Sequence, residues 1–142
     1  MLENRIDASV TAADIQAALE AVALIRTKLP FLLDLTINQR MSLPKLGDGS
    51  RAFVQKALEI AKLNPDILPR SFDIARMERD LELFFELMPV LTAVAQLHEL
   101  LDDTLMQIGS EAMSAALWIY RQVQATPGMD AERSDLSERF AR

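Results

Sequence analysis

The sequence contains no cysteine, a single histidine and few aromatic residues. The absence of cysteine excludes disulfides, thiolate metal ligands and a cysteine nucleophile, and it fits a reducing compartment, so we expect a cytoplasmic protein. Basic residues are also scarce, since 15 Lys and Arg stand against 21 Asp and Glu, for a formal net charge of −6. Because phosphate neutralisation supplies most of the affinity for nucleic acids, this balance predicts no nucleic-acid partner.

Long hydrophobic runs are missing as well. The longest nearly uncharged stretch, Leu87 to Leu97, is about half of the roughly 20 residues that a transmembrane helix needs. The first residues, Met1 to Asp7, include charged side chains and no continuous apolar segment, unlike a secretory signal. The sequence therefore predicts no membrane partner.

The composition that remains is typical of a helical protein. Hydrophobic residues make up 50% of the chain and aromatic residues only 6%, which indicates a core rich in alanine and leucine. We expect an all-α fold, an antiparallel up-and-down helical bundle of four to five helices with a long C-terminal helical region. One domain would span residues 1–142, with residues 1–10 and 129–142 as candidates for fraying.

Capping residues and prolines set the expected boundaries of the first helices. Thr11 predicts the start of a first helix that ends near Pro30, and a second helix is expected from about Arg51 to Leu63. Ser71 or Asp73 can cap a third. Residues 31–37 alternate between apolar and polar as a strand does, but a lone strand has no ladder partner, so a buried connector that can include a helical turn is expected there.

From Asp73 to Pro127 the pattern is helical for about fifty residues and carries one long apolar stripe. We call this stripe the seam, and its alternating spacing of three and four has the coiled-coil period. Its members are Leu87, Leu91, Val94, His98, Leu101, Leu105, Ile108, Ala112, Ala115 and Ile119. A straight helix of this length exceeds the roughly 40 Å diameter of a compact domain of this size. The helix is therefore expected to break or kink at Pro89 or Gly109, more sharply at Pro89, unless the protein is elongated or pairs with another copy.

His98, Glu99, Asp102 and Asp103 are the candidate metal ligands. His98 and Asp102 stand one helical turn apart on the same face, which supplies half of a metal site. The pattern lacks the second histidine of zinc proteases and the Glu-x-x-His pair of di-iron bundles. The competing interpretation is a core histidine that hydrogen-bonds to Asp102 or across the bundle, and we expect no cofactor.

Two further features have alternative interpretations. Trp118 and Tyr120 lie near Met113 at helical spacing, which favours a place in the core, whereas exposure would mark a partner surface. An apolar ligand pocket opened between helices at Pro89 is a third functional possibility.

Several short motifs resemble those of a group of small, uncharacterised bacterial all-helical proteins. They are the stretch Leu43-Pro-Lys-Leu-Gly-Asp-Gly-Ser-Arg-Ala-Phe-Val54, the pair Asn64-Pro65, and Leu100-Leu-Asp-Asp-Thr-Leu105 followed by Gly-Ser-Glu111. The resemblance covers most of residues 30–125. It implies a helical fold and a bacterial cytoplasmic setting, and it brings no catalytic residues.

Together these observations favour a non-enzymatic interaction or structural protein over an enzyme. The first expectation is a helical bundle that binds a protein partner or self-associates through the seam or one end of it. The alternative is a metal-dependent or small-ligand-binding bundle that uses His98 and the neighbouring carboxylates.

Overall fold

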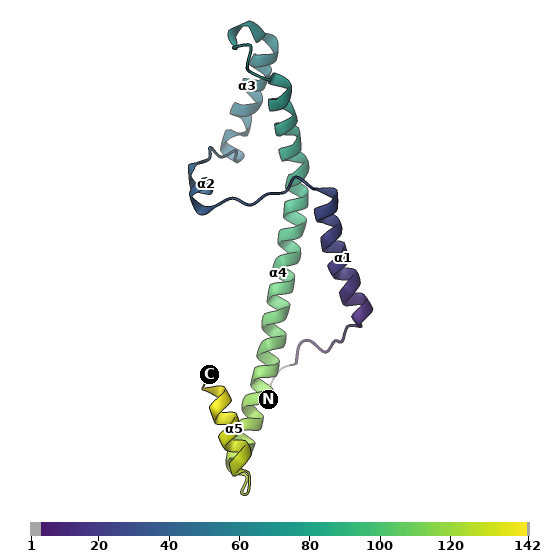
Figure 1. The fold of residues 1–142 in the computed structure, drawn as a ribbon, viewed down its shortest axis with the longest axis vertical. Helices are drawn as coiled ribbons and strands as arrows, with labels where there is room; N and C mark the ends of the chain where they lie inside the picture. The colour runs from purple at the N-terminus through teal and green to yellow at the C-terminus, as the bar shows by residue number, and fades with distance from the viewer. Residues whose placement is uncertain (1–3, 142) are drawn as a thin grey trace. The chain divides into compact units, whose positions relative to one another are not determined.

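A computed structural model describes residues 4–141, and five α-helices account for most of them (Figure 1). The helices are α1 (Ala12–Lys28), α2 (Ile37–Ser42), α3 (Arg51–Leu63), α4 (Ile74–Ala125) and α5 (Asp130–Phe140). Short 3₁₀ turns lie at Asp48–Ser50 and Pro65–Ile67, and no strand forms among the described residues. The all-α prediction is confirmed. The chain divides into two units, residues 10–92 and residues 93–142 together with 1–9.

Side-chain caps begin three of the helices. The Thr11 hydroxyl accepts a hydrogen bond from the Asp14 N–H at 3.1 Å, and the Asp73 carboxylate accepts one from the Arg76 N–H at 3.0 Å. Thr36 caps α2 in the same way. Each cap satisfies a backbone donor that the first helical turn leaves free. The predicted starts of α1 and α4 and the predicted span of α3 are confirmed.

In the first unit, α3 packs beside the N-terminal part of α4 (Figure 1). Lys62 of α3 forms an ion pair with Glu78 of α4. At the other end of α3, the Arg51 guanidinium lies 4.6 Å from the centre of the Phe85 ring, a cation–π geometry. Between these contacts Leu58 and Ala61 are buried. The apolar face of α3 is therefore the small core of this unit.

In the second unit, α5 folds back on the last turns of α4 (Figure 1). The Tyr120 ring stacks on Phe140 with centroids 6.2 Å apart, and the Tyr120 and Ser137 hydroxyls are hydrogen-bonded at 3.0 Å. The Arg133 guanidinium donates to the Thr126 carbonyl at 3.2 Å, near the end of α4 where carbonyls lack helical partners. These contacts join α5 to the end of α4, and the fraying expected for residues 129–142 stays a prediction.

The long helix differs from the expectation in one respect: α4 runs through both Pro89 and Gly109. The predicted break at Pro89 is not found. Proline removes one backbone donor, and glycine costs about 1 kcal/mol relative to alanine. Helix-forming residues, chiefly leucine, alanine, methionine and glutamate, flank both positions, so the helix continues on either side. The seam therefore lies on one uninterrupted helix.

The segment that links α1 to α3 is a second correction. Residues 32–36 form no regular secondary structure, Leu33 is 75% exposed, and Ile37, at the start of α2, is 77% exposed. The prediction of a buried connector is wrong for the described chain. An apolar alternation shows only that one side of a segment suits burial, and another element must supply the cover.

Candidate interaction surface

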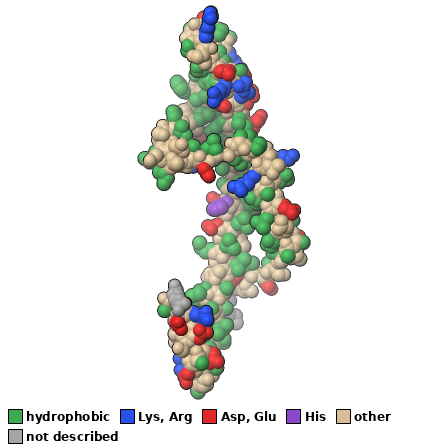
Figure 2. Space-filling view, in the orientation of Figure 1, with side chains coloured by type: hydrophobic (Ala, Val, Ile, Leu, Met, Phe, Trp, Pro, Cys, Tyr) green, Lys and Arg blue, Asp and Glu red, His purple; other side chains and the backbone are tan. Residues whose placement is uncertain are grey.

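The seam is the largest apolar feature of α4, and it is exposed. Nine of its ten members are exposed, and Leu87 is half-buried. Leu91, Leu101 and Leu105 expose 70%, 57% and 68% of their surface. Figure 2 shows hydrophobic side chains at the surface on either side of the single histidine. Exposed apolar side chains that repeat along one helix are typical of a surface that another helix covers.

The apolar surface of α4 is wider than the seam alone. Leu97, Leu100 and Met106 lie outside the seam and are 53%, 66% and 70% exposed. At 100° per residue, the apolar side chains between Leu91 and Ile108 span about 240° of the helix circumference. The apolar stripe of a helix that packs on one neighbour is roughly 100° wide or somewhat more. This part of α4 therefore has the pattern of a helix with two or more neighbours.

All four candidate metal ligands lie on α4, within one and a half turns. His98, Glu99, Asp102 and Asp103 are exposed, and no hydrogen bond joins His98 to Asp102 in the structure. The described residues contain no group of three or more histidine, aspartate or glutamate side chains arranged to hold a metal ion. One helix supplies too few converging ligands, so the metal site stays a prediction that requires a second element. The prediction of a core, hydrogen-bonded histidine is likewise not met in the described chain.

Charge is distributed unevenly along α4. Its central part, from Asp80 to Tyr120, contains no lysine or arginine. The acidic residues in that range are Asp80, Glu82, Glu86, Glu99, Asp102, Asp103 and Glu111. The charged side chains that α4 itself places beside its apolar surface in this range are therefore all acidic, which favours a partner with positive charge at its edge.

The aromatic pair near the end of α4 is divided between two environments. Tyr120 packs against α5, as described above, whereas Trp118 is 57% exposed. The expectation that both belong to the core is wrong for Trp118. An exposed tryptophan beside Ile119, the last member of the seam, extends the apolar surface toward the end of the helix.

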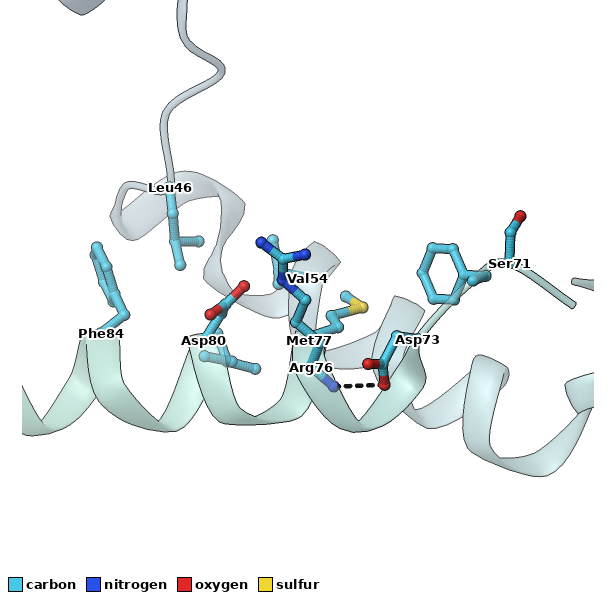
Figure 3. Close-up of a pocket in the computed structure, with 10 residues that line it drawn as sticks. Leu46, Val54, Ser71, Asp73, Arg76, Met77, Asp80 and Phe84 are labelled. Atoms are coloured by element: carbon cyan, nitrogen blue, oxygen red, sulfur yellow. Dashed lines mark hydrogen bonds between the residues drawn. The ribbon is translucent and has the colours of Figure 1, made fainter. Parts of the chain in front are cut away.

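An open hollow of about 520 Å³ lies in the first unit, between α3 and the start of α4 (Figure 3). Leu46, Val54, Met77 and Phe84 line it with apolar atoms. Arg76 is the only basic residue among its lining residues, where Asp73 and Asp80 also lie, and Asp73 is occupied as the helix cap. The hollow does not include Pro89, so it is not the predicted pocket at that proline.

The second unit holds a contact that the sequence did not suggest. The backbone N–H groups of Arg5 and Ile6 both donate to one carboxylate oxygen of Glu111, the latter at 3.4 Å. A shallow hollow beside this contact is lined by Thr104, Gln107 and Ser110, among others. The N-terminal segment thus binds the face of α4 that carries these polar side chains.

No family model, curated protein or solved structure matches the chain. The resemblance to small bacterial helical proteins accordingly stays a prediction.

In the described part of the chain, α4 is the one helix that is long and apolar enough to cross a membrane. The core helix of a soluble protein can have the same length and composition. The acidic residues at the centre of α4 would also be costly in a bilayer. The prediction that the protein has no membrane partner stays a prediction.

Sequence reasoning located the seam but missed two properties of it. The full width of the apolar surface is visible from the sequence once Leu97, Leu100 and Met106 are placed on the helix with the seam. The run of residues without lysine or arginine is also visible there. The contact of Arg5 and Ile6 with Glu111 joins residues more than 100 positions apart, and no local sequence pattern predicts it.

Proposed function

We propose that this protein is a non-enzymatic helical interaction protein that self-associates through the seam of α4. The observation that supports the proposal is the exposure of the seam on a single continuous helix. An isolated helix gains little stability from its own hydrogen bonds, and most helices in proteins depend on packing of an apolar face. A central stretch that exposes leucine on several sides therefore calls for a partner.

The scarcity of buried side chains supports the same proposal. Among the described residues only Leu58, Ala61 and Val123 are buried, although half of the chain is hydrophobic. Chains of about this length usually bury roughly two-thirds of the surface that their unfolded form exposes. Association of two copies would supply the missing core, and the antiparallel helical bundle expected from the sequence would then form between copies.

The proposal predicts a stable oligomer. Sedimentation equilibrium of the full chain between about 1 and 200 μM should give a mass of at least twice the monomer mass of 15.9 kDa. Dilution through the dissociation range should lower the helical signal at 222 nm, because α4 loses its cover. A strict monomer at the highest concentration, with full helical content, would contradict self-association.

His98 gives a second prediction, because it is the one polar member of the seam. A polar residue at a core position of a coiled coil fixes register at a cost in stability. We expect His98→Leu to tighten self-association by about tenfold or more, in line with the roughly 1.5 kcal/mol of burying a leucine. The measurement is the dissociation constant from sedimentation at pH 7.5.

The matched control is Gln96→Leu, which adds the same side chain outside the seam. It should leave the dissociation constant within about threefold of the wild-type value. Equal tightening by both variants, or weakening by His98→Leu, would place His98 outside the contact.

A further inference from the structure

We propose that the part of the seam from Leu101 to Ala115 of one copy is covered by helix α1 of a second copy, in antiparallel orientation. This inference rests on the proposed self-association and specifies which part of the partner makes the contact. It follows from the charge of α4, from the composition of α1 and from the spacing of the apolar residues on both helices.

The charge of α4 argues against pairing of two α4 helices. Each copy contributes seven acidic residues and no lysine or arginine between Asp80 and Tyr120. Placing two such helices side by side would bring together fourteen carboxylates with only two histidines between them. Like charges across an interface oppose association, so the complementary partner carries positive charge.

The last turn of α1 has that charge, while Asp14 and Glu20 stand nearer its start, and the helix has a free apolar face. Ile15, Leu19 and Val22 are 51%, 60% and 55% exposed, and no residue of α1 is buried. Arg26 and Lys28 stand in its last turn, and neither forms an ion pair with any described residue. With 17 residues, α1 is about 25 Å long and can lie along the central part of α4.

The spacing of the two helices matches in the antiparallel direction. On α1, the steps from Ile15 to Leu19 and then to Val22 are four and three residues. On α4, the steps from Ala112 back to Ile108 and then to Leu105 are also four and three. Alignment of the two sets pairs Ile15 with Ala112, Leu19 with Ile108 and Val22 with Leu105.

The same register brings opposite charges together. It places Arg26 and Lys28 at the level of Glu99, Asp102 and Asp103 of the other copy. Those three carboxylates form no ion pair within the described part of the chain. The parallel orientation would instead bring Asp14, in the first turn of α1, to this acidic stretch. The antiparallel direction is therefore the complementary one.

The absence of natural cysteine makes disulfide cross-linking a direct test. One batch of protein carries Leu19→Cys and a second, tagged batch carries Ile108→Cys. The two are mixed, exchanged by brief dilution and oxidised, and the products are identified by mass on a non-reducing gel. We expect a disulfide-linked heterodimer as the main product. The control replaces Ile108→Cys by Ser110→Cys, on the opposite side of α4, and should yield at least tenfold less heterodimer.

A charge-reversal pair tests the same contact without cysteine. The double variant Arg26→Glu and Lys28→Glu should raise the dissociation constant of the oligomer at least tenfold at low salt. Adding Glu99→Lys and Asp102→Lys to that variant should restore the affinity to within about threefold. Variants whose helical signal matches the wild type at high concentration report on the contact rather than on folding.

The outcomes separate this inference from the proposed function. An oligomer that gives no heterodimer and no charge rescue leaves self-association standing and overturns the pairing of α1 with α4. A Leu19→Cys, Ile108→Cys double variant that forms its disulfide only within one chain overturns the pairing between copies as well. A wild-type protein that sediments as a monomer overturns both.

Discussion

Replacing Leu101 and Leu105 by glutamine should convert the protein from an oligomer into a monomer. Both residues belong to the seam and are 57% and 68% exposed on the single chain. Burial of a leucine side chain contributes about 1.5 to 3 kcal/mol, and a dimer would lose four such side chains. At the low end of that range the loss is roughly 6 kcal/mol, which corresponds to about a 10⁴-fold weaker association.

Sedimentation and circular dichroism would measure this result together. Because the uncovered centre of α4 has little else to hold it helical, the variant should also lose helical signal at 222 nm. The matched control is the double variant Leu33→Gln and Leu63→Gln, whose leucines are 75% and 74% exposed and lie outside α4. An oligomer that survives the seam variant, or that the control disrupts equally, would locate the contact elsewhere.

Replacing Leu58 by alanine should destabilise the first unit by about 2 to 3 kcal/mol. Leu58 is one of the few buried side chains, and it lies one helical turn after Val54, which lines the hollow between α3 and α4. Truncation of a buried leucine removes its transfer free energy and leaves a cavity. The lower part of the usual range of 2 to 5 kcal/mol applies because the two helices enclose this site only partly.

Urea denaturation, followed at a fixed protein concentration, would report the free energy of unfolding. Leu63→Ala is the control, because it makes the same change in the same helix at a side chain that is 74% exposed. It should change the free energy of unfolding by no more than about 0.5 kcal/mol. Equal effects of the two substitutions would mean that the contact between α3 and α4 contributes little.

Ion pairs contribute less to this contact than the apolar side chains do. The side chains of Lys62 and Glu78 remain 46% and 37% exposed in their ion pair. Exposed pairs are typically worth between 0 and 1 kcal/mol. The packing of α3 on α4 is therefore expected to depend on Leu58 and Ala61 rather than on this pair.

Much of the fold could be predicted from the sequence because its signals are local. Thr11 and Asp73 cap helices through hydrogen bonds that span three residues. The span of α3 follows from its apolar spacing and from the Asn64-Pro65 pair that ends it. Such signals act within one or two helical turns, so neither a partner nor the rest of the chain is needed to interpret them.

The predicted break at Pro89 shows a limit of predictions from local sequence patterns. The expected break rested on fitting about fifty helical residues into a compact domain, which assumed that the chain covers its own apolar surface. In the structure α4 continues through Pro89 and exposes the seam. The helical pattern itself was correct, and the expected break at Pro89 was wrong.

The sequence by itself determined that the chain is all-α, where most helices begin and end, and which residues share the apolar face of α4. These properties depend on backbone hydrogen bonding and on a period of 3.6 residues, and both involve only residues that are close together in the sequence. The tertiary structure decided that Leu58 and Ala61 of α3 are buried, that Glu111 binds the backbone of Arg5 and Ile6, and that the seam lies open. Burial depends on which elements pack against one another, and the residues that cover a side chain can be distant from it in the sequence.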